Sequence, residues 1–161
     1  MTNAQIETLR SSDVEIVAKL HAKCFFDAWG PPMLRQVLGM TGAFGYVARR
    51  DGYGSVVGFA LARVAADACE LLSLGVEPDF RSQGIGAHLL TTAMSRAAAA
   101  KARWFFLEVA EDNKSALQLY RNYGLSGVGQ RLDYYENADG SRTNAHTMRC
   151  ALPAMVNASG D

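Results

Sequence analysis

The stretch from residue 71 to residue 87 places the strongest constraint on how this chain can fold. An apolar run, Leu-Leu-Ser-Leu-Gly-Val, leads into a Pro-Asp turn, and Arg-Ser-Gln-Gly-Ile-Gly then opens a long helical pattern. A strand, turn and helix in this order leave free backbone N–H groups at the helix N-terminus, where the helix dipole favours negative charge. The stretch therefore predicts a pocket for phosphate or pyrophosphate. Gly-x-Gly turns are also common in ordinary loops, and the motif alone does not establish a site.

The residues on either side of the turn predict a strand–helix–strand unit. Apolar residues of the helix recur on one stripe from Ile85 to Ala97, and the helical pattern ends near residue 101. Strand patterns occupy residues 69–76 before the helix and residues 104–110 after it, where the run Trp-Phe-Phe-Leu indicates a buried strand. We therefore expect two parallel neighbouring strands joined by a right-handed crossover.

The rest of the chain fits one α+β domain with a mixed sheet of about seven strands and about four helices. The further predicted strands are residues 6–9, 44–49, 55–64, 125–135 and 143–152, and the further predicted helices are residues 11–24, 31–39 and 113–123. Short turns, including one at residues 51–54, join the early strands into an antiparallel meander. We assign residues 1–152 to the domain and residues 153–161 to a frayed tail.

Composition excludes several classes of protein. The chain has 16 basic and 16 acidic residues and no long basic run, so neither nucleic acid nor an anionic membrane is an expected partner. No apolar run reaches the roughly 18 residues of a spanning helix, and the first residues do not resemble a signal peptide. We therefore expect a cytoplasmic protein of one domain.

The spacing of cysteine and histidine gives no sign of a metal site. Cys24, Cys69 and Cys150 are odd in number and far apart, and the histidines at positions 21, 88 and 146 are scattered. We expect reduced, buried thiols, with neither a disulfide framework nor a bound metal, and we assign the histidines no chemistry.

Two ordered motifs resemble those of the GNAT superfamily, the GCN5-related N-acetyltransferases. Residues 76–86, Val-x-Pro-x-Phe-Arg-x-Gln-Gly-x-Gly, resemble its acetyl-CoA-binding motif. Residues 107–124 begin with Leu-Glu-Val and continue with Asn-x-x-Ala-x-x-x-Tyr-x-x-x-Gly, which resembles its second motif. The pair is far more specific than either motif alone, and the resemblance covers nearly the whole chain. It implies the GNAT fold.

Within the superfamily the chain most resembles the RimI type, the ribosomal protein S18 alanine N-acetyltransferases. The similarity lies in Leu-Glu-Val before Asn113, in Gln-Arg-x-x-Tyr-Tyr at residues 130–135, and in the Asp-Gly turn at residues 139–140 that leads to Met-Arg. It implies direct attack in a ternary complex, moving acetyl from acetyl-CoA to a protein's N-terminal α-amine, with ribosomal protein S18 as the leading candidate. The chain departs from the family at Leu125, where Phe is usual, and in the Gly-Pro-Pro after Trp29, where a Ser or Thr helix cap is common. The second departure bears on the acceptor.

The resemblance assigns the coenzyme to the turn and to the edge of the preceding strand. The N–H groups of residues 82–87 would cradle the pyrophosphate, with further donors from Arg81 and Gln83. The pantetheine arm would pair with the strand edge, and a main-chain N–H near Val76 would stabilise the developing oxyanion. Asn113 matches a coenzyme-contacting Asn, although a helix N-cap explains the same residue. The coenzyme-binding residues implied by the resemblance are Leu74, Gly75, Val76, Arg81, Ser82, Gln83, Gly84, Ile85, Gly86, Ala87 and Asn113.

Two residues are candidates for proton transfer. Glu108 ends an otherwise apolar strand, where burial would strengthen it as the base that takes the amine proton, directly or through a water. Without the resemblance, a polar residue at a strand end would be the plainer interpretation. Tyr120 lies on the inner stripe of its helix, as core aromatics do, and its match to the family's Tyr makes it the proton donor to the coenzyme A sulfur. By resemblance, Tyr134 and Tyr135 would line the acceptor groove.

The acceptor is the least determined part of the reaction. An α-amine has a pKa of about 8 and a lysine amine one of about 10.4, so at pH 7 about a tenth of the α-amine is already neutral. This agrees with N-terminal acetylation and leaves a lysine or a small-molecule amine as alternatives. A non-catalytic acyl-CoA-binding sensor is a further alternative, against which the presence of both Glu108 and Tyr120 argues. The sequence is compatible with a monomer or a dimer.

Overall fold

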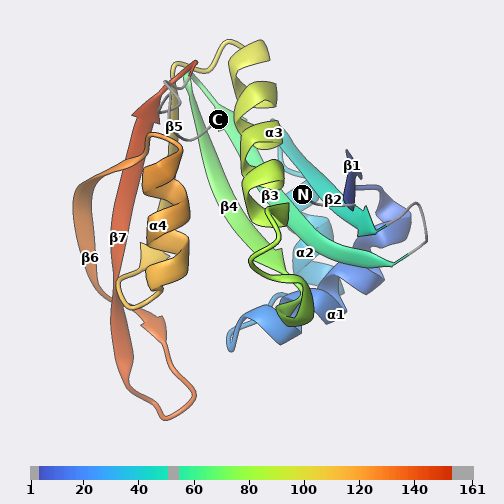
Figure 1. Cartoon of the computed structure of the whole chain (residues 1–161), viewed down its shortest axis with the longest axis horizontal. Coiled ribbons are helices and arrows are strands. Elements are labelled where there is room, and N and C mark those ends of the chain that lie inside the picture. Colours follow the sequence, from blue (N-terminus) through green and yellow to red (C-terminus); the bar gives the residue numbers. More distant parts are fainter. Residues whose placement is uncertain (1–3, 51–54, 154–161) are drawn as a thin grey trace.

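The described part of the chain, residues 4–50 and 55–153, forms a seven-stranded mixed sheet with the strand order β1-β2-β3-β4-β5-β7-β6 (Figure 1). The strands of this computed structural model are β1 (Ala4–Thr8), β2 (Ala43–Arg50), β3 (Val56–Ala65), β4 (Ala68–Val76), β5 (Trp104–Ala110), β6 (Ser126–Glu136) and β7 (Arg142–Ala151). β4 and β5 are parallel, and the other neighbouring pairs are antiparallel. The α+β class, the mixed sheet, the meander and the two C-terminal strands predicted from the sequence are confirmed, and those two strands form an antiparallel hairpin.

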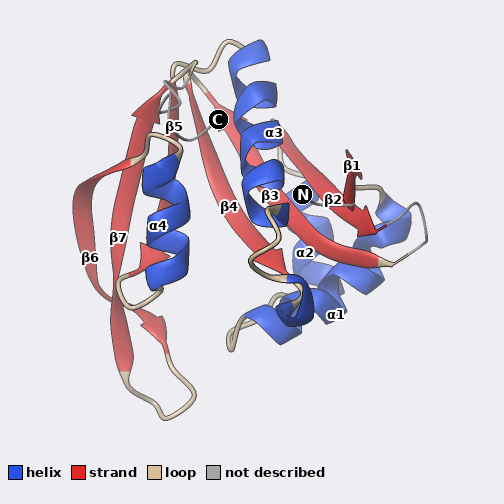
Figure 2. Cartoon of the chain, viewed as in Figure 1, coloured by secondary structure: helices blue, strands red, loops and turns tan. Residues whose placement is uncertain are grey.

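Helices cover both faces of the sheet (Figure 2). They are α1 (Val14–Cys24), α2 (Pro31–Leu38), α3 (Ile85–Ala99) and α4 (Lys114–Asn122), and short 3-10 turns at Ser11–Asp13 and Pro78–Phe80 precede α1 and α3. Successive residues of a strand point to opposite faces. In β3, Leu61 packs in the cluster that contains α1 and α2, whereas Ala60 packs in the cluster that contains α3 and α4. The two pairs of helices therefore lie on opposite faces.

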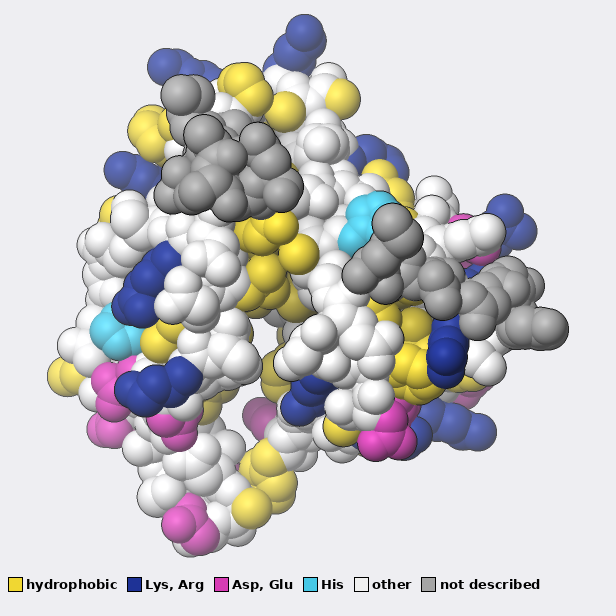
Figure 3. All heavy atoms as spheres, in the orientation of Figure 1, with side chains coloured by type: hydrophobic (Ala, Val, Ile, Leu, Met, Phe, Trp, Pro, Cys, Tyr) yellow, Lys and Arg dark blue, Asp and Glu magenta, His cyan; other side chains and the backbone are white. Residues whose placement is uncertain are grey.

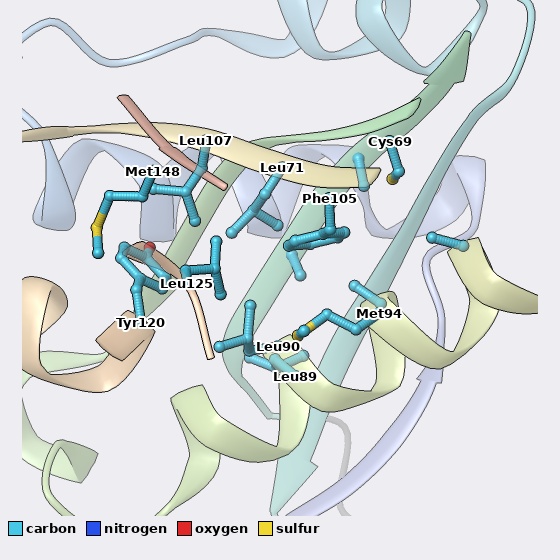
Figure 4. Packing of buried hydrophobic residues seen from close by; sticks show 14 of the residues in the cluster. Cys69, Leu71, Leu89, Leu90, Met94, Phe105, Leu107, Tyr120, Leu125 and Met148 are labelled. Carbon is cyan, nitrogen blue, oxygen red and sulfur yellow. The ribbon is translucent and has the colours of Figure 1, made fainter. Parts of the chain in front are cut away.

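The face under α3 and α4 holds the larger core cluster (Figure 4). The apolar stripe predicted for α3 is buried, and Leu89 and Leu90 are both 0% exposed. They lie in one cluster with Leu71 of β4 and Phe105 of β5. Because burying one such side chain contributes about 1.5–3 kcal/mol, this packing holds α3, and the turn before it, firmly against the two parallel strands.

β4 and β5 pair over only part of their length. Their parallel register ends where Leu71 lies opposite Leu107, although both strands continue beyond that point. The register of β4 against β3 shifts at the same level, between Leu61 and Ala62, and such a bulge bends a strand. The two strands diverge in the ribbon view (Figure 1), and the space-filling view is open between the halves of the molecule (Figure 3). Main-chain groups of β4 consequently face a gap in place of a neighbouring strand.

Some sequence-based expectations fall where the structure gives no description. The turn predicted at residues 51–54 and nearly all of the tail predicted at residues 153–161 lie outside the described residues. Cys24, Cys69 and Cys150 are free thiols. Among the helices that the structure describes, none is both long enough and apolar enough to cross a bilayer.

Candidate active site

The turn between β4 and α3 presents a run of unpaired main-chain N–H groups. Within the described residues, no acceptor meets the N–H groups of residues 82–87, and the first bond of the helix runs from the His88 N–H to the Gly84 carbonyl at 3.0 Å. Ser82 and Gly84 have positive φ angles of 64° and 83°. Alternation of left-handed and ordinary backbone directs successive N–H groups into a concave anion site, which the helix dipole reinforces. The turn thus fits the pyrophosphate-binding role that the sequence predicts.

Side chains of the same turn have different surroundings. The Arg81 Nε donates to the Val76 carbonyl at 3.0 Å, so this side chain bends back to the end of β4. Ile85 is buried in the core, which leaves only its main chain for a ligand. Gln83 and Ala87 are exposed and partly exposed, respectively. A Cβ built on Gly86 would lie 3.5 Å from the Leu119 side chain of α4, an ordinary contact.

The end of β4 exposes alternate main-chain groups to the gap left by β5. The Glu77 N–H donates to the Val57 carbonyl of the neighbouring chain segment at 2.8 Å. Because hydrogen bonds in an antiparallel pair alternate along the strand, Gly75 bonds toward β3, whereas Leu74 and Val76 direct their N–H groups toward the gap. A Cβ on Gly75 would come within 2.7 Å of the Phe59 ring, so a larger residue cannot fit there without movement.

Glu108 lies on β5 beside this gap. Its side chain is 13% exposed, and its Oε1 accepts a hydrogen bond from Arg131 Nη1 at 2.8 Å. Its Oε2 is buried and has no hydrogen-bond partner among the described residues. The Tyr135 hydroxyl donates to the main-chain carbonyl of Glu108 at 3.1 Å. An unsatisfied buried carboxylate oxygen costs about 1–3 kcal/mol or more, and a functional role would explain why it is kept.

Glu70 is a second carboxylate at this place, and it was not predicted from the sequence. It lies on β4 opposite Phe106 of β5, and residues 106 and 108 point to the same face, so Glu70 and Glu108 are diagonal neighbours. Burial and the charge of Glu108 raise the pKa of Glu70, while Arg131 acts in the opposite direction. An acidic residue within an otherwise apolar strand could have drawn attention to Glu70. Its closeness to Glu108, however, becomes evident only when the register of β4 and β5 is known.

Tyr120 lies on α4 with its ring among core side chains, near Leu125 and Met148 (Figure 4). The residue is 7% exposed, and its hydroxyl has no hydrogen-bond partner in the part of the chain that the structure describes. Burial, together with the nearby Tyr135, raises the pKa of Tyr120 above its usual value. The hydroxyl therefore stays protonated at neutral pH and has its hydrogen free to donate.

Asn113 occupies the N-cap of α4. Its Oδ1 accepts a hydrogen bond from the Ala116 N–H at 3.2 Å, and the Ser115 hydroxyl approaches the same oxygen at 3.3 Å. The helix-cap role that the sequence suggested is therefore present. The side-chain NH₂ of Asn113 meets no acceptor among residues 4–50 and 55–153, so it can still donate to a ligand.

His21 ties the loop around Trp29 to the floor of the sheet. The main-chain N–H of Trp29 donates to its Nδ1 at 3.1 Å, so the proton sits on Nε2, which donates to the Ser73 hydroxyl of β4 at 3.1 Å. The rings of His21 and Trp29 stack with centres 5.0 Å apart. Burial lowers the pKa of His21 to about 4. A neutral histidine thus positions the loop between α1 and α2. The sequence analysis assigned it no such role, because the bond to Ser73 joins residues far apart in the chain.

Residues 14–125 match the family model described as the acetyltransferase (GNAT) family. The chain belongs to this family. Over 150 residues it is 35% identical to the N-alpha-acetyltransferase RimI of Mycobacterium tuberculosis, covering 89% of this chain and 90% of the relative. Over 98 residues it is 34% identical to a ribosomal protein bS18-alanine N-acetyltransferase of Haemophilus ducreyi, covering 61% of this chain and 68% of that protein.

A solved structure shows the same GNAT fold. The ribosomal-protein-S18-alanine N-acetyltransferase of Escherichia coli superposes with a TM-score of 0.85 and 23% sequence identity, covering 96% of this chain and 97% of its own. The resemblance drawn from the two sequence motifs is thereby confirmed at the level of family and fold. In this GNAT chain, Glu108 and the end of β4 lie beside the gap between β4 and β5, and the turn before α3 follows β4 directly.

Proposed function

We propose that this GNAT chain is an N-α-acetyltransferase that moves an acetyl group from acetyl-CoA to the N-terminal α-amine of a protein. The observation that carries the proposal is the Glu108 carboxylate beside the gap between β4 and β5, with one oxygen that has no partner among the described residues. The similarity to an N-alpha-acetyltransferase over nearly the whole chain supports the α-amine as acceptor.

The β4–α3 turn and the end of β4 would hold acetyl-CoA. The unpaired N–H groups of residues 82–87 suit its pyrophosphate, and the N–H groups of Leu74 and Val76 suit the amides of its pantetheine arm. The free NH₂ of Asn113 would add a donor, and Gln83 lies at the rim. In this arrangement acetyl-CoA supplies the thioester that the amine attacks.

Two side chains of this chain would move the protons. Glu108 takes the proton that the acceptor amine loses, directly or through a water, because a carboxylate can accept it without rearrangement of the strand. Tyr120 gives its hydroxyl proton to the departing sulfur, and the raised pKa keeps this hydroxyl protonated until the sulfur needs it. No metal takes part in this scheme.

The acceptor that we favour is the N-terminal alanine of ribosomal protein S18. The relatives from Haemophilus ducreyi and Escherichia coli are named for this activity. An α-amine with a pKa of about 8 is partly neutral at pH 7, so a single carboxylate suffices as base. Ribosomal proteins are made in the cytoplasm, which is where we expect this enzyme to act.

A peptide that begins with the N-terminal residues of S18 tests the proposal. Acetyl transfer from acetyl-CoA should occur to this peptide and fail with a matched peptide whose α-amine is blocked and whose lysines are free. Mass spectrometry of the products would place the acetyl group. Transfer to the blocked peptide, or transfer only to small amines, would contradict the α-amine assignment.

Gly84→Val should weaken binding of acetyl-CoA about 5- to 30-fold, because a β-branched residue at a positive φ carries about 1–2 kcal/mol of strain. A Cβ at Gly84, where φ is 83°, would meet no atom within 4 Å, so the effect comes from the backbone and not from a clash. Calorimetric titration measures the affinity. Gly127→Val is the matched control, since its Cβ also finds open space and its φ is ordinary. Unchanged affinity in Gly84→Val would show that the turn does not bind the coenzyme.

A further inference from the structure

Arg131 brings a positive charge from the β6–β7 hairpin to the candidate base. Its Nη1 lies 2.8 Å from Glu108 Oε1, and its guanidinium carbon lies 4.3 Å from the centre of the Tyr134 ring. The Tyr135 hydroxyl bonds to the Glu108 carbonyl and so ties the same hairpin to the same residue. Two contacts of the hairpin thus reach Glu108, and the Tyr134 ring lies against the guanidinium that makes one of them.

The ion pair does not act on Glu108 alone. Glu70 lies on the same face of the sheet as Glu108, and two neighbouring carboxylates disfavour each other's ionisation. Burial and then the charge of Glu108 raise the pKa of Glu70, whereas Arg131 and Arg63 act to lower it. Tyr134 and Tyr135 also face this group, and burial and the charge of Glu108 raise the pKa of both. Arg131 is therefore a positive charge that lies near both carboxylates and near two tyrosine hydroxyls that stay protonated.

Stability of the fold does not explain this arrangement. The Arg131 side chain is 57% exposed, and ion pairs with an exposed partner contribute little to stability. The pair nevertheless occupies one oxygen of Glu108 and leaves the other without a partner among the described residues. If the ion pair served only to join the hairpin to β5, hydrogen bonds to both carboxylate oxygens would stabilise that contact more.

We propose that Arg131 is a positioning residue for acetyl transfer that acts through Glu108: it binds Oε1, reserves Oε2 for the amine proton, and offsets the second negative charge of Glu70 at the acceptor site. Two carboxylates and one guanidinium leave one net negative charge, which attracts a cationic α-ammonium. The proposal rests on the proposed function for the identity of the base. It adds to that function the groups that bind and orient the base.

The pH dependence of kcat/KM tests this role. Removing the positive charge favours the protonated carboxylates, so in Arg131→Met the acid limb of the profile should move up by about one pH unit. The alkaline plateau should also fall, because Glu108 Oε1 loses the partner that orients it. Arg131→Lys keeps a charge and should restore most of the acid limb. Adding Glu70→Gln to Arg131→Met should bring the limb part of the way back, because the repelling carboxylate is gone.

Controls separate this role from a merely structural one. Arg142→Met removes an exposed arginine of the same hairpin, which pairs with Glu136 at 3.2 Å, and should leave the profile unchanged. An even loss of activity at all pH values in both Arg131→Met and Arg131→Lys would overturn the proposal, since a structural defect does not depend on charge.

A readout that needs no activity keeps the test independent of the acceptor. Carbon NMR of the glutamate carboxyls should show Glu70 titrating at higher pH in Arg131→Met than in wild type, with Glu70→Gln used for assignment. If wild type acetylates no α-amine but this shift appears, the proposed function is wrong. The inferred effect of the Arg131 charge on Glu70 is then still supported. If wild type is active and neither the NMR titration nor the acid limb moves, the inference about Arg131 is wrong and the proposed function survives.

Discussion

Glu108→Gln is expected to lower kcat/KM for an α-amine acceptor by about 100-fold or more at neutral pH, since general base catalysis contributes about 10²–10⁴-fold. Glutamine keeps the volume of the side chain and an oxygen for Arg131, whose Nη1 lies 2.8 Å from Oε1 in the wild type. It cannot take a proton from the amine. Initial rates over a range of acceptor concentrations, at saturating acetyl-CoA, measure the change, and acetyl-CoA affinity should stay close to that of wild type.

Glu111→Gln is the matched control for this prediction. Glu111 follows the same strand, is 40% exposed, and accepts a hydrogen bond from Gln130 at 3.2 Å instead of facing Arg131. Its substitution removes a carboxylate from the same region and should leave kcat/KM within about twofold, as surface changes usually do. A loss of less than tenfold in Glu108→Gln, with a melting temperature like that of wild type, would show that another group takes the proton.

Most of the fold could be predicted from the sequence, because the patterns that identify its helices, strands and turns lie within short stretches of the chain. The stripe that identifies α3 depends on residues three and four apart, and Gly124 ends α4 with the positive φ of 94° typical of a residue after a helix. The turn from Ser82 to Ala87 could be predicted for the same reason, since its unpaired N–H groups come from consecutive residues. Local periodicity and chain order were sufficient at these places.

The acceptor side could not be predicted in the same way, because it depends on registers between distant strands. Glu70 and Glu108 become neighbours only when β4 and β5 pair with Leu71 opposite Leu107. Arg131 reaches Glu108 across 23 positions of sequence, and His21 reaches Ser73 across 52. The sequence offered Glu108 and Tyr120 as candidates for proton transfer through a family motif. The residues that surround Glu108 could be identified only from the three-dimensional structure.

Tyr120→Phe is expected to lower kcat about 10- to 100-fold, with little change in the KM for acetyl-CoA. The expected loss lies at or below the bottom of the usual 10²–10⁴-fold range for acid–base catalysis, because a thiol, with a pKa of about 8.5, leaves more readily than an alcohol. Steady-state rates with both substrates varied measure the effect. The raised pKa of Tyr120 keeps its hydroxyl protonated, so ionisation of this residue should not limit the wild type at mildly alkaline pH.

This substitution separates catalysis from packing unusually well. The Tyr120 hydroxyl has no hydrogen-bond partner in the described part of the chain, so removing it should leave the melting temperature nearly unchanged while the ring still fills the core. Tyr123→Phe is the matched control, because Tyr123 directly follows the same helix and packs on the same core, where it lines a pocket with Thr91 and Leu152. Equal rates in the two variants would mean that the coenzyme A thiolate leaves without a proton from Tyr120. A loss confined to Tyr120→Phe, at unchanged stability, would assign the proton to this hydroxyl and not to bulk water.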